Sequence, residues 1–269
     1  MGYGQAWSRP RIVAILVAAA AAALTLVGGA VAAVVLALSP AGDATTGAQP
    51  GPTPGGQGPV RPGGVGRDAI AAAPMLQVSP ADATGGTPST TLPGTIIVPN
   101  PTEVGPARVA TGFPPTPQGA AGQLGAILVN VAQTMSIPRA HEVHRAWTEP
   151  GAGPAKDWAM TQNVATFLDG AGLSGQEAGT RARIEVVPVA AQIKGVDGDD
   201  WVVACVLLNM TASIDRTIDV AYGQCERMTW QQDRWVIAAG DPPAPAPSTW
   251  PGTDLAAEAG WLTWQPDTP

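Results

Sequence analysis

The most pronounced hydrophobic pattern is an unbroken apolar run near the start of the chain. Residues 12–38 are 27 positions without a charge, and about 20 apolar residues suffice to cross a bilayer as a helix. Arg9 and Arg11 precede the run and the first acidic residue is Asp43. The positive-inside rule then places residues 1–11 in the cytoplasm and all later residues outside. We predict a single-pass plasma-membrane helix; the alternative, a cleaved secretory signal, has an apolar region of only about 7–15 residues.

The apolar pattern then disappears over residues 39–110. This stretch has no periodic apolar face, and Pro or Gly occupies more than a third of its positions. Such a segment cannot bury enough surface to offset the entropy of ordering it. We predict a disordered linker, with a short apolar island at residues 94–100 that is either an edge strand or unstructured.

Helical spacing begins at residue 117, inside a predicted extracytoplasmic domain of residues 111–240. Thr116 before Pro117 combines a capping hydroxyl with a first-turn proline, and apolar residues follow at helical spacing: Leu124, Ile127, Leu128 and Val131. Glycines at 119, 122 and 125 form a side-chain-free strip, which predicts close approach of another element rather than a nucleotide site. Two further helices are predicted, over residues 136–147 and about 155–170.

From residue 181 the pattern changes to that of strands. Four segments separated by short turns predict an antiparallel meander, and the second has the nearly continuous apolar run of a central strand buried on both faces. Residues 241–269 read as a Pro-rich tail with one short helical turn. The expected fold class is α+β, with helices packed on a curved antiparallel sheet.

Composition and charge narrow the candidate functions. Lys156 and Lys194 are the only lysines among 14 basic residues, and Ala, Gly and Pro are frequent, which indicates a GC-rich bacterial genome. The net charge is -7 for the chain and becomes -9 for residues 39–269, with 12 basic and 21 acidic residues. Nucleic-acid binding is not expected, because it needs a basic surface to neutralise phosphates.

The only two cysteines, Cys205 and Cys225, lie on consecutive predicted strands. A three-residue turn or a one-residue bulge would place them directly opposite each other, at a separation that a disulfide can bridge. An exported location permits oxidation. The alternative is a pair of buried free thiols that behave as small apolar residues.

Other residues that carry chemistry form no strong catalytic pattern. His141 and His144 are spaced i, i+3 without a third ligand, so surface histidines are expected rather than a metal site. Trp201, Trp230 and Trp235 on neighbouring strands either line a ligand pocket or fill the core. We predict no enzyme activity, no cofactor and no metal.

Three stretches carry a resemblance: residues 112–127 (GFPPTPQGAAGQLGAI), 135–153 (MSIPRAHEVHRAWTEPGAG) and 245–261 (PAPSTWPGTDLAAEAGW). They resemble a group of actinobacterial membrane proteins associated with mobile elements. The element order resembles the TcpC-type scaffold subunits of bacterial conjugation and type IV secretion. This resemblance implies a nuclear-transport-factor-two-like cone outside the membrane, with no catalysis.

The sequence thus supports two functions of different classes. The first is a membrane-anchored, non-catalytic scaffold that contacts the bilayer through residues 12–38 and binds protein partners or itself. The alternative is an exported module that holds a small apolar ligand in a cone pocket.

Overall fold

The computed structural model describes residues 64–268, apart from residues 92, 174 and 215. The predicted membrane span and the first part of the predicted linker lie outside these residues. None of the helices in the described part combines the length and the apolar character needed to cross a membrane. The helices are α2 (Gly64–Ala72), α3 (Pro117–Ala132), α4 (Ile137–Trp147), α5 (Ala159–Gly170) and α6 (Asp254–Glu258).

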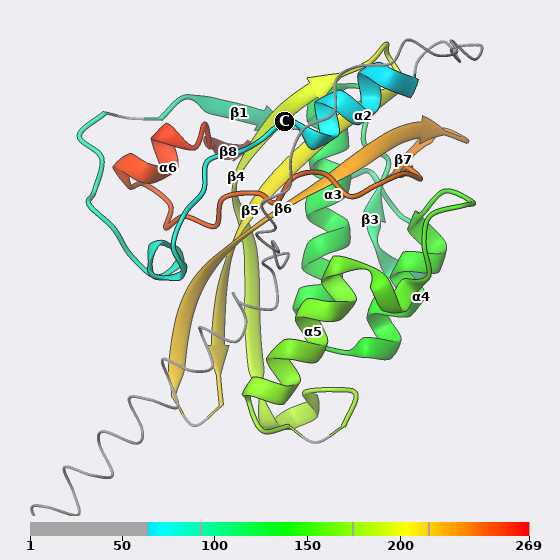
Figure 1. Ribbon diagram of the computed structural model, residues 1–269. Helices are drawn as coiled ribbons and strands as arrows, with labels where there is room; N and C mark the ends of the chain where they lie inside the picture. The colour runs from blue at the N-terminus through cyan, green and yellow to red at the C-terminus, as the bar shows by residue number, and fades with distance from the viewer. Residues whose placement is uncertain (1–63, 92, 174, 215, 269) are drawn as a thin grey trace, which may run out of the picture. The chain divides into compact units, whose positions relative to one another are not determined.

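A six-stranded sheet forms the centre of the fold (Figure 1). Its strand order is β1-β8-β4-β5-β6-β7. The bounds are β1 (Thr95–Val98), β4 (Arg183–Val196), β5 (Trp201–Ser213), β6 (Thr217–Gln231), β7 (Arg234–Ile237) and β8 (Leu262–Pro266); β2 (Glu103–Val104) and β3 (Ala110–Thr111) form a separate ribbon.

The sheet is mixed rather than antiparallel. The predicted meander is present as β4–β7, but β1 pairs with β8 in parallel. Two register shifts in the pairing of β4 with β5, at Pro188/Ala190 and Ile193/Gly195, bend the long strands. The result is a curved, half-barrel sheet with helices packed against it, which confirms the α+β class.

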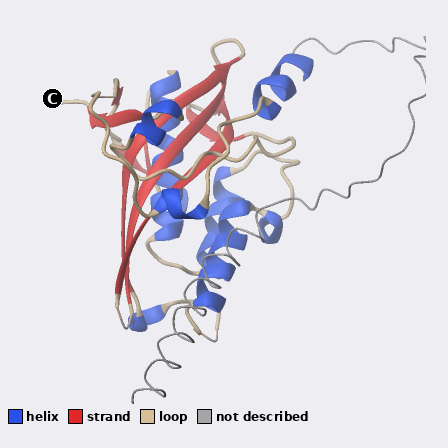
Figure 2. Ribbon diagram, turned by 60° about the vertical axis from the view of Figure 1, so that its left-hand side comes forward, coloured by secondary structure: helices blue, strands red, loops and turns tan. Residues whose placement is uncertain are grey.

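Helices α3, α4 and α5 cover one face of the sheet, here called the helix face (Figure 2). On β5 this face presents Val202, Ala204, Val206 and Leu208. The apolar stripe predicted for α3 packs against it and is fully buried at Leu124, Ile127, Leu128 and Val131. The predicted Thr116 cap is present, because its side chain accepts from Gly119 N. Ser136, where the second helix was predicted to begin, caps α4 in the same way by accepting from Arg139 N.

The glycine strip of α3 lies where other side chains approach the helix closely. A Cβ at position 122 would lie 2.6 Å from Phe113 and 3.1 Å from Val98. A Cβ at position 125 would lie 2.9 Å from Trp264 on β8. The close approach predicted from the glycine spacing is confirmed, and part of it comes from β1 and β8.

The opposite face, here called the disulfide face, presents Trp201, Val203, Cys205 and Leu207. It is covered by segments that precede and follow the β4–β7 meander in the sequence. Residues 64–110 include α2, a 3-10 turn at Pro80–Ala83, β1 and β2, so the prediction of a disordered linker is wrong for this part. Apolar residues of this stretch, such as Ala71 on the disulfide face and Val109 on the helix face, are 0% exposed and supply buried surface that the periodicity test missed.

The predicted Pro-rich tail is also part of the fold. Residues 241–261 cross the disulfide face, where Trp261 is 3% exposed. The chain then enters the sheet as β8, whose residues Leu262 and Thr263 pair with Ala191 and Ala190 of β4. The boundary predicted at residue 240 therefore divides one folded unit.

Candidate functional site

A row of polar side chains lines β6 on the helix face. Tyr222, Gln224 and Glu226 alternate along the strand, so all three point to the same side of the sheet. The Tyr222 hydroxyl donates to Gln224 Oε1, and Gln224 Nε2 donates to Glu226 Oε1 at 3.0 Å. These three residues form a connected chain of hydrogen bonds under the helices.

Helix α5 supplies the partners of this polar row. Trp158, which precedes the helix, donates from its indole Nε1 to Glu226 Oε1 at 2.9 Å. Asn163, one turn further, donates from Nδ2 to the Tyr222 hydroxyl at 2.6 Å. The polar row therefore fastens α5 to β6, because both ends of the row accept hydrogen bonds from that segment.

The electrostatics of the row are dominated by burial. Glu226 is 7% exposed, and burial raises the pKa of its carboxyl to about 7, with the hydrogen bonds from Trp158 and Gln224 acting in the opposite direction. Burial, and then the charge on Glu226, raises the pKa of the Tyr222 phenol. Glu226 is thus an acid that titrates near neutrality inside the fold.

His144 packs beside Trp158. The two ring centroids are 5.5 Å apart, and burial, followed by the charges of His141 and Arg145, lowers the pKa of His144. The expectation of two surface histidines is therefore wrong for His144, which is 7% exposed because α4 turns it towards α5. Within the described residues no group of three or more His, Cys, Asp or Glu could hold a metal.

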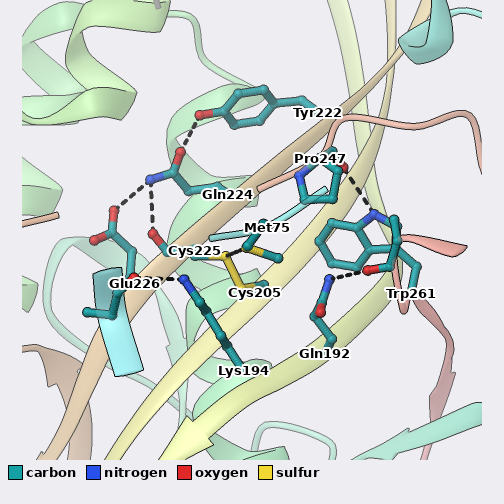
Figure 3. The surroundings of a disulfide bond; sticks show 12 residues. Met75, Gln192, Lys194, Cys205, Tyr222, Gln224, Cys225, Glu226, Pro247 and Trp261 are labelled. Carbon is teal, nitrogen blue, oxygen red and sulfur yellow. Dashed lines mark hydrogen bonds between the residues drawn. A yellow bond between two sulfur atoms is a disulfide. The ribbon is translucent and has the colours of Figure 1, made fainter. Parts of the chain in front are cut away.

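On the disulfide face, Cys205 and Cys225 are joined by a disulfide (Figure 3). Ser213 pairs with Thr217 across a three-residue turn, which places the two cysteines directly opposite each other. Their side chains are covered by the segments outside the meander, and the Met75 sulfur lies 3.6 Å from the Cys225 sulfur. Figure 3 shows this bond on one side of β6, with Gln224 and Glu226 on the other.

Charged residues also tie the covering segments to the disulfide face. Arg227 donates to the Asp241 carbonyl at 2.7 Å and to the Asp68 carboxylate at 2.6 Å. Lys194 donates from Nζ to the Ala71 carbonyl at 2.7 Å, and burial lowers its pKa. These bonds hold α2 and the start of the tail on the same face.

Of the two alternatives for Trp201, Trp230 and Trp235, a shared pocket or core filling, the structure shows core filling. Trp201 is 2% exposed on the disulfide face. Trp230 and Trp235 lie on the helix face as a T-shaped pair with centroids 5.5 Å apart, and Trp235 donates to the Pro114 carbonyl at 2.9 Å. Adjacent strand positions alternate between faces, so Trp201 and Trp230 point in opposite directions, and all three act in the core.

Two hollows are present at other places. A groove of about 730 Å³ lies along β1 and the start of α3. A second hollow, of about 490 Å³, lies between β4 and α6 and includes Trp261, Trp264 and three prolines in its lining. Neither hollow is lined by Tyr222, Gln224 or Glu226.

Sequence reasoning missed both the polar row and the grooves. On β6 the alternation of Tyr222, Gln224 and Glu226 was the available signal, but a polar side of a strand usually faces solvent. The grooves depend on β1 and β8, whose pairing joins residues 95–98 with 263–266. A contact across so many residues leaves no local periodic signal.

The chain matches no family model, and no similar protein was found among the curated proteins or the solved structures.

Proposed function

We propose that this protein is a membrane-anchored, non-catalytic scaffold or interaction protein. The observation that carries the proposal is the way the helix face is filled. Large side chains such as Leu124, Trp147 and Trp235 are at most 1% exposed there, and the polar groups of the Glu226 row bond to one another. A site for chemistry needs convergent polar groups that a substrate can reach, so the filled helix face supports a function carried by the outer surface.

The disulfide supports an extracytoplasmic location. Disulfides persist in oxidising compartments and are rare in the bacterial cytosol. The bond between Cys205 and Cys225 agrees with the orientation derived from residues 1–38. On this proposal residues 12–38 cross the plasma membrane once and the folded unit lies outside, separated from the bilayer by the residues before α2.

The fold family and the kind of assembly in which the protein acts are part of the same proposal. Helices that pack on one face of a half-barrel sheet agree with a nuclear-transport-factor-two-like cone, although β1 and β8 extend the predicted four-stranded meander. The proposed role is a subunit of a conjugal transfer or type IV secretion assembly. It rests on the resemblance of residues 112–127, 135–153 and 245–261 to mobile-element membrane proteins.

Membrane attachment can be tested in the full chain. We expect the protein to remain in the membrane fraction after alkaline carbonate extraction and a variant lacking residues 12–38 to be released. A thiol-reactive reagent that cannot cross the membrane should label a cysteine introduced at exposed Val104, but not one at Ser8, in intact cells. A full chain that behaves as a cytosolic protein contradicts the anchor.

The interaction role needs its own measurement. Crosslinking of the full chain in membranes should give specific adducts with another subunit or with itself, whereas Glu226→Gln and His144→Gln should leave these adducts unchanged. A strictly monomeric chain without adducts, or loss of cellular function in the two buried-residue variants at normal protein levels, contradicts a non-catalytic scaffold.

A second function, binding of a small apolar ligand, is favoured by the hollow between β4 and α6. Its volume of about 490 Å³ lies in the range of small-molecule sites, and Trp261, Trp264 and Leu207 contribute to its wall. This location differs from the predicted cone pocket. Thermal-shift assays with a lipid and metabolite panel test it: stabilisation should be lost when Ala256→Trp fills the hollow, and absence of any stabilisation contradicts ligand binding.

A further inference from the structure

Several parts of the sheet edge have no strand partner, and most of these parts are covered by other groups. On β7, Glu149 N donates to the Ile237 carbonyl at 2.8 Å and Thr148 forms a bridge with the same residue. The segment after α4 therefore pairs with the end of this outer strand. A protein that leaves a strand edge exposed risks unwanted pairing, so such coverage is expected.

The N-terminal part of β4 is also protected against strand addition. Strand β8 pairs with β4 only at Ala190 and Ala191, which leaves the edge from Arg183 to Pro188 without a strand partner. Gln133 Nε2 donates to the Val186 carbonyl there at 3.5 Å, and Pro188 has no N–H to offer. Exposed Arg183 and Glu185 add charges, so this edge has the usual devices against strand addition.

Within Thr95–Val98 the outer edge of β1 has no proline and no charged side chain, although Pro93 and Pro99 flank the strand. Thr263 N donates to Gly94 O at 2.8 Å and Asp267 N donates to Val98 O at 2.9 Å, which shows that the even-numbered residues of β1 face β8. Backbone groups alternate along a strand, so those of Thr95 and Ile97 face away from the sheet. None of the described residues makes a hydrogen bond with these outward groups.

The side chains around this edge suit an apolar strand. Ile97 is 56% exposed. The groove of about 730 Å³ is lined by Thr95, Ile97 and Pro99 of the β1 segment and by Pro114, Thr116 and Gln118 at the start of α3, among others. None of the eleven lining residues is charged. An edge with free N–H and C=O groups beside an uncharged groove can bind an extended peptide, with backbone bonds for affinity and the groove for alternate side chains.

We propose that the outer edge of β1 is a strand-addition site for an extended, uncharged segment of a partner protein. The incoming segment pairs with the backbone of Thr95 and Ile97 and places alternate side chains in the groove beside α3. Pro93 and Pro99 lack N–H groups, so the pairing is limited to a segment of about five residues. The inference rests on the proposed interaction function and names where and how that interaction occurs.

The charge of the folded unit favours a different chain over a second copy as the partner. Residues 64–269 contain 11 basic and 20 acidic residues, a net charge of -9. Two such units repel each other, whereas an uncharged segment meets no repulsion in the groove. The site therefore selects a partner segment by shape and backbone pairing.

The test uses the full chain in detergent micelles and a displayed library of random nine-residue segments. An enriched segment is synthesised, and its affinity is measured by fluorescence anisotropy. We expect N-methylation of the alternate peptide amides that face β1 to weaken binding at least tenfold, and methylation of the other alternate amides to change it less than threefold. Hydrogen exchange should slow at Thr95 and Ile97 when the peptide is bound.

Two variants provide a matched control. Ile97→Lys places a charge in the groove and should weaken peptide binding at least tenfold. Val187→Lys alters a residue that is 54% exposed at the protected β4 edge and should leave peptide binding unchanged. The fold of both variants is checked by circular dichroism and thermal unfolding. Three results would each overturn the proposal. The two methylated peptides bind equally weakly, the two variants change the affinity equally, or no enriched segment slows hydrogen exchange at Thr95 and Ile97.

Self-pairing is a separate outcome that also overturns it. If light scattering shows a dimer of the full chain and Ile97→Lys dissociates it, the edge binds a second copy rather than a foreign segment. The proposed function is tested independently by the membrane crosslinking above. Adducts that persist unchanged in Ile97→Lys would retain the interaction role and remove β1 as its site.

Discussion

The two faces of the sheet are both buried, but they are built from different parts of the chain and by different interactions. The helix face is covered by one continuous stretch, α3–α5, and its buried acid Glu226 bonds only to neutral partners, Trp158 and Gln224. The disulfide face is covered by segments distant in the sequence. Its buried Arg227 bonds to the Asp241 carbonyl and to the Asp68 carboxylate, which is itself 70% exposed.

This difference predicts how each face responds to change. Periodic apolar packing should make the helix face sensitive to cavities and, through Glu226, to pH. The disulfide face depends on a covalent link and on a few polar bonds to peripheral segments, so it should respond to reduction and to local opening. The four predictions below test these responses in order of decreasing size.

The largest effect is expected from a cavity in the helix face. Leu128→Ala removes a side chain that is 0% exposed on α3, and such changes cost about 2–5 kcal/mol of unfolding free energy. Urea unfolding measures this loss. Val187→Ala, on an exposed strand position, is the control and should stay within about 0.5 kcal/mol; a similarly small change for Leu128→Ala would contradict tight packing of α3.

The second prediction concerns the bond that defines the disulfide face. Replacing Cys205 and Cys225 together by Ala should lower the unfolding free energy by about 2–4 kcal/mol under oxidising conditions. Reductant should lower the stability of the unaltered protein by a similar amount and leave the double variant unchanged. Alkylation of both thiols in protein unfolded without reductant would show that the bond is absent.

The helix face is the part that could be predicted from sequence. Thr116, Ser136 and the apolar spacing of α3 are local signals, and each acts within one or two helical turns. The direct opposition of Cys205 and Cys225 required only the length of one turn. The sequence therefore predicts the three covering helices and the meander with useful boundaries.

The disulfide face was missed because its signals are not local. Ala71 and Met75 lie in a short apolar stretch, residues 69–76, that is interrupted by Pro74 and flanked by Pro- and Gly-rich segments. Bonds from Lys194 and Arg227 hold this segment on the sheet. The parallel pairing of β1 with β8 joins the predicted linker to the predicted tail. The candidate strand-addition edge follows from that pairing, so it could not be found from periodicity.

The third prediction uses pH to separate the faces. Burial raises the pKa of Glu226 to about 7 in the folded state, above its ordinary value near 4.5. The folded state therefore retains a proton that the unfolded state releases, and this contribution to stability is complete below pH 4.5 and lost as the pH rises to about 7. Glu226→Gln keeps the Oε1 acceptor for Trp158 and Gln224 without the charge.

We expect Glu226→Gln to raise the unfolding free energy at pH 8 by about 1–3 kcal/mol. The variant should also lose the decline in stability between pH 4.5 and 7. Thermal unfolding across this range measures both effects, with Glu258→Gln, an exposed site on α6, as the control. An unchanged pH dependence of stability in Glu226→Gln would mean that the Glu226 carboxyl is not shielded from water in the folded state.

The smallest effect is expected from the ion pair that holds α2. Asp68→Asn removes the carboxylate that accepts from Arg227 Nη1 at 2.6 Å, but Asp68 is 70% exposed, so the change in global stability should be about 1 kcal/mol or less. Hydrogen exchange should nevertheless accelerate in α2 and remain unchanged in α3, because the bond connects only a peripheral segment to the sheet. Asp157→Asn, in an exposed pair with Lys156, is the matched control and should leave exchange in α2 unaltered. Equal acceleration in α2 and α3 would show that the two faces open together and that the distinction between them does not extend to their dynamics.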